Sequence, residues 1–367
     1  MECGHFNTSC VMEEVMGMKK SKIINVGIVG YGYWGPNLVR NFVGNKKCEV
    51  STICELDTKK WTLIRKKYPN VSITKDYEEL INNPEIDAIV IATPVFSHYP
   101  LAKQALEKGK HIFVEKPLAT KVAEAQELVN LSRQNGCILF VDHTFEYSPP
   151  VIKIKEILDS GKIGEIYYVA SSRINLGLFQ PDISVIWDLA PHDFSILFYW
   201  LDEEPLEISV VGKGFIRKEI PDAAFINMKF ASGVTANIHI SWLSPIKLRR
   251  TTIIGSKKMI VYDDTQEIEK VKIYHNVVTI KEPEDFGQYH LSYRTGNIVS
   301  PRLEAVEPLN RAVNHFLECI NSGEEPKTNG ENALRVVRAL ESAEMSLRDN
   351  GNGIRNMSKY KATTVLI

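Results

Sequence analysis

The feature that most constrains the fold is a glycine-rich turn that directly follows an apolar, strand-like segment. Residues Ile23–Val29 are mostly apolar, and the next six, Gly30–Gly35, read Gly-Tyr-Gly-Tyr-Trp-Gly. Such a turn between a strand and a helix brings backbone amides close to an anion at the helix N-terminus, where the helix dipole favours negative charge. Glu55 follows about 20 residues later, at the end of the next apolar run, where a carboxylate accepts hydrogen bonds from ribose hydroxyls. The pattern predicts a dinucleotide-binding start to the chain.

Strand and helix signals alternate over residues 21–147. The strand-like runs are Ile23–Gly30, Val50–Glu55, Ala88–Thr93, His111–Glu115 and Cys137–Asp142. The helical patterns between them are Pro36–Val43, Asp57–Lys67, Asp76–Asn82, His98–Lys108 and Thr120–Gln134. Apolar strands that alternate with helices imply a parallel sheet covered on both faces, so we expect a doubly wound Rossmann domain here.

The pattern changes after residue 147, and residues 148–367 are expected to form a second, α+β domain. One helical pattern, Val151–Ser160, precedes seven strand-like runs, and two helical patterns close the chain. The runs are Ile166–Asn175, Ile208–Phe215, Ala224–Phe230, Val234–Trp242, Thr251–Gly255, Met259–Tyr262 and Val271–Ile280; the closing helices are Leu309–Ile320 and Ala333–Arg348. Apolar and polar residues alternate cleanly in Val234–Trp242, which predicts a half-buried, mostly antiparallel sheet.

Composition favours a globular protein with two domains, because a chain of 367 residues is longer than one typical core. A net charge of −1 gives no concentrated basic surface, which argues against a nucleic-acid partner. No apolar run reaches the roughly 18 residues that a membrane span needs, so no membrane insertion is expected.

Six cysteines without C-x-x-C spacing suggest reduced thiols and a cytoplasmic protein. Residues 1–20 lack the apolar core of a signal peptide and are expected to be a mobile extension.

The sequence Glu115-Lys116-Pro117 ends the strand-like run that begins at His111. Ligands bind at the carboxyl ends of the strands in a doubly wound sheet, which places Lys116 beside the reactive end of a bound dinucleotide. Proline restricts the residue before it, so the lysine is held extended. Beside a nicotinamide cation and away from bulk water, its ammonium is expected to exchange a proton near neutral pH. The alternative is a solvated lysine at a strand end.

A second strand ends at the same edge with Ala92-Thr93-Pro94. Thr93 is a candidate donor to the cofactor, and His98 is either another cofactor contact or a capping or packed histidine. A carboxylate at Glu55 would repel a 2′-phosphate, so NAD is expected rather than NADP, unless the turn is only structural and Glu55 only a surface residue. The full set of candidate cofactor-binding residues is Gly30, Gly32, Tyr33, Trp34, Gly35, Glu55, Thr93, Pro94, His98, Glu115 and Lys116.

Asp188 and His192 lie four residues apart, so both side chains face one way if Asp188 opens a helix. The imidazole can move a hydroxyl proton, and a carboxylate can fix its tautomer or orient a substrate. The same pair could hold a metal, but the sequence offers no third ligand, so no metal is expected. A helix cap at Asp188 with a packed His192 is the structural alternative. With Lys116, these two are the candidate catalytic residues.

Polar residues of the second half are candidate substrate ligands. Arg173 and Asn175 lie on the strand that enters this half, whereas Tyr293 and Arg294 fall in a loop-like segment rich in hydrogen-bonding side chains. Ordinary surface polarity is the alternative for all four. The basic stretch at residues 247–258 is better explained by a solvated sheet edge than by contact with an anionic substrate.

The motifs closely resemble the glucose-fructose oxidoreductase/myo-inositol dehydrogenase family, often called Gfo/Idh/MocA. The resemblance covers about residues 22–350 and rests on Gly30–Gly35, Ala92–Pro94, Glu115–Pro117 and the Asp188/His192 pair. It implies a Rossmann domain followed by an α/β domain with a large open sheet. In this family the open sheet often mediates oligomerisation, so the resemblance implies a homodimer or homotetramer.

The resemblance also implies that Lys116 and His192 are the catalytic acid/base candidates, with Asp188 assisting. Many members have Asp-x-Gly-x-His at the last motif, whereas Ala190 and Pro191 precede the histidine here.

The expected function is that of an NAD-dependent oxidoreductase that moves a hydride between a sugar hydroxyl carbon and nicotinamide. The segments Trp187–Asp193, Tyr293–Gly296 and Glu307–Leu309 are similar to a branch linked to nucleotide-sugar modification. That similarity implies a UDP-N-acetylhexosamine or its uronate, oxidised at C3, with His192 or Lys116 receiving the hydroxyl proton. A keto-sugar reductase, an NAD-dependent glycosidase without net redox change and a non-catalytic cofactor-binding sensor are the alternatives.

Overall fold

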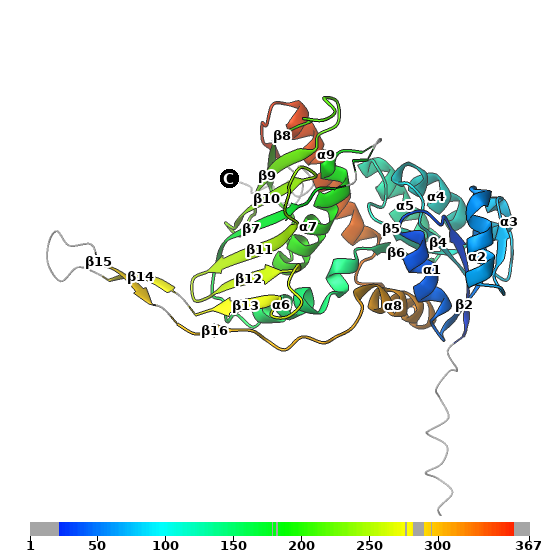
Figure 1. Ribbon diagram of the computed structural model, residues 1–367, viewed down its shortest axis with the longest axis horizontal. Coiled ribbons are helices and arrows are strands. Elements are labelled where there is room, and N and C mark those ends of the chain that lie inside the picture. The colour runs from blue at the N-terminus through cyan, green and yellow to red at the C-terminus, as the bar shows by residue number, and fades with distance from the viewer. Residues whose placement is uncertain are drawn as a thin grey trace, which may run out of the picture.

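The computed structural model describes residues 22–355, except residues 178, 181–182, 276, 282–289 and 295, and it describes only the backbone of strand residues 277–281 and 290–294. The expected extension at residues 1–20 therefore lies outside the described residues. Two halves, each built around its own β-sheet, lie side by side in Figure 1.

The first half contains a six-stranded sheet in the order β3-β2-β1-β4-β5-β6, and every neighbouring pair is parallel. The chain moves outward from β1 in one direction and then restarts at β4 on the other side, which creates the switch point where doubly wound sheets bind ligands. The strands are β1 (Ile24–Val29), β2 (Cys48–Cys54), β3 (Ser72–Thr74), β4 (Ala88–Ile91), β5 (His111–Glu115) and β6 (Leu139–Asp142). The short β3 is the only one of the six that the sequence patterns did not predict.

Helices cover both faces of this sheet. One face packs against α1 (Gly35–Val43) and α8 (Pro308–Ser322). The opposite face packs against α3 (Tyr77–Ile81), α4 (His98–Glu107), α5 (Val122–Gln134) and the beginning of α9 (Gly330–Arg348). Three short 3-10 helices, η1 (Thr58–Lys60), η2 (Val95–Ser97) and η3 (Thr144–Tyr147), and helix α2 (Trp61–Lys67) complete this half.

The last two long helices belong to the core of the first half although they follow the second sheet in sequence. Phe316 of α8 packs edge-on against Phe113 of β5, whose ring stacks on Phe140 of β6 at a centroid distance of 4.8 Å. Helix α9 contributes buried residues to the cores of both halves. The boundary near residue 147 stays a prediction, and α9 ties the two halves together.

The second half contains a nine-stranded sheet in the order β16-β13-β12-β11-β7-β10-β9-β8-β17. All neighbouring pairs are antiparallel except β7 and β10, which are parallel. The strands are β7 (Ile166–Ile174), β8 (Glu207–Lys213), β9 (Ala223–Lys229), β10 (Thr235–Ser241), β11 (Leu248–Gly255), β12 (Met259–Asp263), β13 (Val271–Tyr274), β16 (Ile298–Val299) and β17 (Ile354–Arg355). The run predicted as one strand, Val271–Ile280, is divided between β13 and β14 (Val277–Lys281), and β14 pairs with β15 (His290–Arg294).

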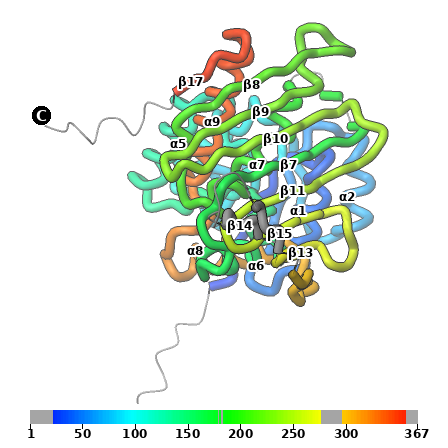
Figure 2. Tube along the Cα trace, turned by 90° about the vertical axis from the view of Figure 1, so that its left-hand side faces the viewer, coloured from blue at the N-terminus to red at the C-terminus, as the bar shows by residue number. Residues whose placement is uncertain are grey.

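One face of this large sheet is covered and the other is open. Helices α6 (Pro149–Asp159), α7 (Val185–Leu201) and α9 pack on the covered face. The open face is turned toward the viewer in Figure 2, with no helix in front of it. The predicted alternation is present, because Ala236, Ile238 and Ile240 are buried while the intervening side chains face the open side. The predicted fold class is confirmed.

Helix α7 is longer than the sequence suggested and carries Pro191 in its interior. The helix is apolar nearly all round because it is buried between the sheet and the first half, so it shows little 3.6-residue periodicity. Proline also lacks the N–H that an interior helical position normally donates. Both features make the helix difficult to predict from the sequence.

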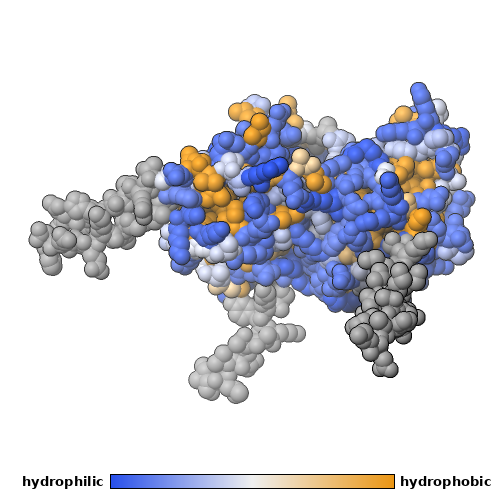
Figure 3. All heavy atoms as spheres, turned by 90° about the horizontal axis from the view of Figure 1, so that it is seen from below, coloured by the Kyte–Doolittle hydropathy of each residue, from blue (hydrophilic) through white to orange (hydrophobic). Residues whose placement is uncertain are grey.

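The face seen from below is mostly hydrophilic, with apolar side chains gathered in separate patches over both halves (Figure 3). Within the parts of the chain that the structure describes, no helix combines the length and apolar character needed to cross a bilayer.

Candidate active site

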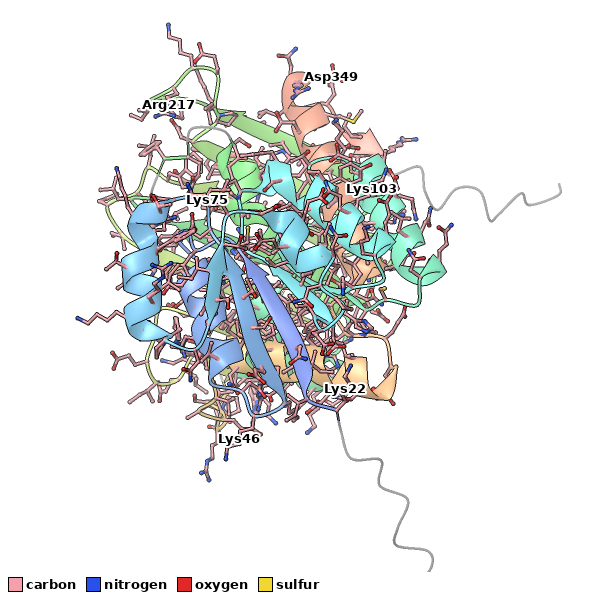
Figure 4. All side chains as sticks on the ribbon, turned by 90° about the vertical axis from the view of Figure 1, so that its right-hand side faces the viewer. Lys22, Lys46, Lys75, Lys103, Arg217 and Asp349 are labelled. Carbon is pink, nitrogen blue, oxygen red and sulfur yellow. The ribbon has the colours of Figure 1, made fainter. Side chains whose placement is uncertain are left out.

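The carboxyl ends of the parallel strands lie on the edge of the first sheet that faces the second half. Lys22 and Lys46, which precede β1 and β2, lie at one edge of this half, and Lys75, which follows β3, lies toward the opposite edge (Figure 4). A cavity of about 1020 Å³ opens at the carboxyl edge. Its walls come from both halves and include Trp34, Lys116, Asp142, Asn175, His192 and Trp242.

The glycine turn has the geometry that a dinucleotide requires. Gly30 has a φ of +93°, and a Cβ there would lie 2.7 Å from the carbonyl oxygen of Ala92. A Cβ at Gly35 would lie 2.6 Å from the carbonyl oxygen of Gly30, whereas one at Gly32 would meet nothing within 4 Å. Gly30 and Gly35 are therefore needed to form the turn, and Gly32 leaves open space beside the N-terminus of α1, where a pyrophosphate fits.

Glu55 closes this turn from the end of β2. One carboxylate oxygen accepts a hydrogen bond from the amide of Tyr31 at 2.7 Å, and the other accepts from the amide of Asp57 at 2.8 Å. The ammonium of Lys60 lies 3.3 Å from the first oxygen. A carboxylate has about four acceptor sites, so ribose hydroxyls can still donate to Glu55. Its role as the ribose ligand stays a prediction.

His98 is buried inside the protein. Its Nδ1 lies 2.8 Å from the carbonyl oxygen of Pro117, and its Nε2 lies 2.8 Å from that of Thr93. Both ring nitrogens are thus engaged by the two loops that follow β4 and β5. Burial and these two contacts favour the packed-histidine alternative for His98, whose ring connects the loops, and its contact with the cofactor stays a prediction. Thr93 accepts a hydrogen bond from the hydroxyl of Ser97 at 2.7 Å.

Lys116 joins the first half to α7. The peptide bond between Lys116 and Pro117 is cis. The ammonium donates a hydrogen bond to the backbone carbonyl of Asp188, 72 residues away, at 2.7 Å, and lies 3.7 Å from a carboxylate oxygen of the same residue. The other carboxylate oxygen accepts from the indole N–H of Trp242 at 3.0 Å. Two motifs that are far apart in the sequence therefore meet at one wall of the cavity.

His192 lines the cavity one helical turn after Asp188. The two residues share no hydrogen bond among the described side chains, so the structure does not support the expected role of Asp188 in fixing the imidazole tautomer. Burial lowers the pKa of His192 well below its usual value, and the positive charges of Lys116, Arg173 and Arg249 lower it further. The imidazole is therefore neutral near pH 7 and can accept a proton.

Glu115 and Asp142 form a carboxyl pair at the wall of the cavity. They are direct neighbours in the register of β5 and β6, and Oε1 of Glu115 and Oδ2 of Asp142 are buried without a hydrogen-bond partner among the residues that the structure describes. Burial raises the pKa of both groups, and for Glu115 the adjacent Asp142 raises it further. Two like charges in one buried site disfavour each other, so ionisation of one carboxyl opposes ionisation of the other. Asp142 was not among the predicted residues, although it ends a parallel strand at the same edge as Lys116.

The predicted substrate ligands divide into three cases. Asn175 lines the cavity, as expected for a binding residue. Arg173 is only 5% exposed and donates a hydrogen bond to Asp193 at 2.6 Å, so the prediction that it binds substrate is corrected. The alternation along β7 turns Arg173 toward the helices on the covered face. The side chains of Tyr293 and Arg294 lie outside the described residues.

Other parts of the wall were not predicted. Arg249 and Lys270 both approach the carboxylate of Asp264, at 3.4 and 3.2 Å, and all three line the cavity together with residues 303–309. Arg249 thus faces the cavity, although the basic stretch was interpreted as a solvated edge. Among the residues that the structure describes, no group of three or more His, Cys, Asp or Glu side chains is arranged to hold a metal ion.

Comparison with known proteins places this site in a family. Residues 24–143 match the model of the GFO_IDH_MocA oxidoreductase family with an NAD-binding Rossmann fold, and residues 151–261 match the GFO/IDH/MocA C-terminal domain. The chain belongs to the Gfo/Idh/MocA family. The predicted resemblance is confirmed, and the protein is an NAD-binding oxidoreductase.

Individual Gfo/Idh/MocA relatives are distant. The uncharacterized oxidoreductase YdgJ of Escherichia coli is 35% identical over 182 residues, which cover 46% of this chain and about half, 51%, of that protein. The myo-inositol 2-dehydrogenase of Thermotoga maritima is 23% identical over 89% of this chain and 97% of its own. A solved UDP-N-acetylglucosamine 3-dehydrogenase of Acidithiobacillus ferrooxidans has the same fold, with a TM-score of 0.73, 20% identity, and coverage of 89% of this chain and 98% of its own.

Proposed function

We propose that this chain is a dehydrogenase that uses NAD to oxidise a CH–OH group of a sugar. One observation carries the proposal: Lys116, Asp188 and His192 converge on a single cavity at the carboxyl edge of an NAD-binding sheet. NAD, when bound, accepts a hydride. A myo-inositol dehydrogenase among the relatives acts on a cyclic polyol, which supports a substrate of this class.

Different side chains of the site carry out the remaining tasks of the reaction, which are proton transfer, hydrogen bonding to the reacting oxygen and orientation of the substrate. Neutral His192 accepts the hydroxyl proton as the carbinol C–H bond breaks and the C=O bond forms. Lys116 donates a hydrogen bond to the reacting oxygen, and its contact with the Asp188 carbonyl holds the ammonium in place. Trp242 and Lys116 together fix the Asp188 carboxylate, which leaves it directed at substrate hydroxyls. Holding these groups in place before the reaction supplies much of the rate enhancement.

The preferred substrate is a nucleotide-activated sugar, such as a UDP-N-acetylhexosamine or its uronate, oxidised at C3. A cavity of about 1020 Å³ is at the upper end of the roughly 300–1,000 Å³ typical for one ligand, so it has space for more than a monosaccharide beside the cofactor. Arg249 and Lys270 share one acid, Asp264, and can orient an anionic diphosphate or carboxylate. The fold neighbour that oxidises UDP-N-acetylglucosamine has the same architecture.

A product assay tests this function. The purified enzyme is incubated with NAD and a panel of nucleotide sugars and free sugars, while NADH absorbance is followed and products are identified by mass spectrometry. NADH together with a product two hydrogens lighter, from a nucleotide sugar alone, is the expected result. Oxidation of free sugars alone would overturn the nucleotide-sugar assignment. Glycosidic cleavage without NADH, or NADH consumption with keto-sugars as the sole activity, would overturn the dehydrogenase assignment.

We also propose that copies of the chain associate through the open face of the nine-stranded sheet, as a dimer or tetramer in the cytoplasm. Val211, Phe225 and His239 are direct partners across three strands of that face, and Val211 and Phe225 are 65% and 47% exposed. Apolar side chains on an uncovered sheet favour association of two copies of the chain.

The proposed cytoplasmic location rests on the cysteines, because the four within the described residues are free thiols, which suits a reducing compartment. The association has a separate test. Phe225→Asp is expected to shift the mass measured by light scattering to that of a monomer.

A further inference from the structure

Among the residues that the structure describes, none makes the hydrogen bond that usually fixes a catalytic imidazole to His192. Its Nδ1 is buried without a hydrogen-bond partner in this part of the chain, and the Asp188 carboxylate is turned toward Trp242 and Lys116. An imidazole ring that transfers protons must be held in a defined orientation toward the substrate. Some other contact must therefore hold this ring.

The ring of Phe145 makes that contact. It meets the imidazole of His192 edge to face, with the centroids 5.0 Å apart and the planes at 68°. Phe145 also lies against the guanidinium of Arg173, whose Cζ is 4.7 Å from the ring centroid. A guanidinium over an aromatic face is attracted by the ring quadrupole, and more strongly when it is desolvated. Arg173, Phe145 and His192 thus form a stack that ends at the cavity.

The far end of the stack is anchored in the covered face of the large sheet. The Nε of Arg173 donates to one carboxylate oxygen of Asp193 at 2.6 Å, and Ser171 donates to the other at 2.7 Å. The Ser171 hydroxyl in turn lies 2.9 Å from that of Thr251 on the neighbouring strand. Arg173 and Asp193 are both nearly fully buried, so their charges are compensated mainly by each other.

The stack links three elements that come from different parts of the chain. Phe145 lies in η3, directly after the last strand of the NAD-binding sheet; Arg173 lies on β7; His192 and Asp193 are neighbours on α7. We propose that Arg173, anchored by Asp193, is a positioning residue that presses the Phe145 ring against His192 and so fixes the direction of the imidazole in the cavity. This inference rests on the proposed role of His192 as the proton acceptor.

Removal of Arg173 also changes the charge around the imidazole. The groups that act on His192 are Lys116 after β5, His143 after β6, Arg173 on β7 and Arg249 on β11, together with its own burial. All of them lower the pKa of His192, so loss of the Arg173 cation is expected to raise it. A loosened ring would add to that shift because water would reach the imidazole.

Nuclear magnetic resonance of histidine-labelled protein tests the stack without any need for turnover. The His192 signals are assigned by their loss in His192→Gln. In Arg173→Met/Asp193→Leu, which removes both buried charges together, they are expected to shift because the Phe145 ring is no longer held, and to titrate at higher pH than in the wild type because water reaches the loosened imidazole. Phe145→Leu, which keeps the Arg173–Asp193 pair, is expected to shift them as well, and Phe145→Tyr to restore them. Unchanged His192 signals in folded Phe145→Leu would overturn the proposal, even if the double variant does not fold.

Kinetics supplies the second readout. A misplaced imidazole is expected to lower kcat by about 10- to 100-fold, while the Kd for NAD stays within twofold. The control is Lys103→Met, because Lys103 also lies over an aromatic ring, that of Tyr99 on α4, and neither residue is among those that line the cavity; its kcat and His192 titration should match the wild type. Shifted His192 signals with a wild-type kcat would overturn the positioning role. If no sugar is oxidised even by the wild type, the proposed function fails, whereas the resonance experiment still decides whether Arg173 holds the ring.

Discussion

The carboxylate of Glu55 accepts a hydrogen bond from the backbone amide of Tyr31 at 2.7 Å, across 24 residues of sequence. This contact ties the end of β2 to the glycine-rich turn after β1, so one acidic side chain stabilises the turn and is also the residue predicted to bind the adenosine ribose. Substitution of Glu55 is therefore expected to affect cofactor affinity and cofactor choice through the same atom.

Glu55→Ala is expected to weaken NAD binding and to narrow the preference for NAD over NADP, because the carboxylate that repels a 2′-phosphate is lost. Titration of both cofactors by calorimetry measures the change. Glu49→Ala, on the exposed side of the same strand, serves as the control and should bind both cofactors normally. Equal losses of affinity for NAD and NADP in Glu55→Ala would show that the residue only stabilises the glycine-rich turn.

Lys116→Ala is expected to lower kcat by about 10²- to 10³-fold, the usual range for loss of a hydrogen-bond donor to the reacting oxygen, with a much smaller change in the Kd for NAD. The structural reason is that the ammonium reaches the Asp188 carbonyl in the cavity rather than the glycine turn. Steady-state rates and NAD titration together give the comparison. Parallel losses in turnover and affinity would instead assign Lys116 to cofactor binding.

The pH dependence of kcat/KM is expected to show an acid limb below the usual histidine range of about 6.5. His192 must be neutral to accept a proton, and burial with nearby cations lowers its pKa, so protonation and loss of activity occur only in more acidic solution. His192→Gln should remove this limb and lower kcat strongly. A limb centred at or above the usual value would argue that another group accepts the proton.

His143→Phe is expected to reduce the loss of stability in acid. His143 is buried, neither ring nitrogen has a hydrogen-bond partner among the described residues, and burial with the charge of Lys116 lowers its pKa to about 3. The unfolded chain takes up this proton below about pH 6.5 while the folded protein does not, so folding loses up to about 1.4 kcal/mol per pH unit between those values. Denaturant unfolding from pH 7 to pH 4 measures the slope, and an unchanged slope in the variant would contradict the expectation.

The sequence predicts the first half well because its strands are buried on both faces and therefore appear as apolar runs between helical patterns. β3 escapes detection because it has only three residues, Ser72–Thr74. Helix α7 escapes because burial on all sides removes the periodicity and because Pro191 suggests an interruption.

The roles of individual side chains are harder to predict from the sequence than the helices and strands. Lys116, Asp188 and His192 could be predicted because each has a chemically distinctive neighbour pattern, and the structure brings them to one cavity. The orientations of His98 and Arg173 could not, because they depend on loops and helices packed from elsewhere in the chain.

The helices that complete the NAD-binding half come from the end of the chain. A ribosome releases all six parallel strands before it begins α8, yet the sheet face that holds Phe113 and Phe140 receives Phe316 only after strands β7 to β16 have been synthesised. Helix α1 already packs on this face, but the part of the aromatic surface that α8 covers stays exposed until translation is nearly finished. Genetic separation of the two halves at the loop after β6 would make that temporary exposure permanent.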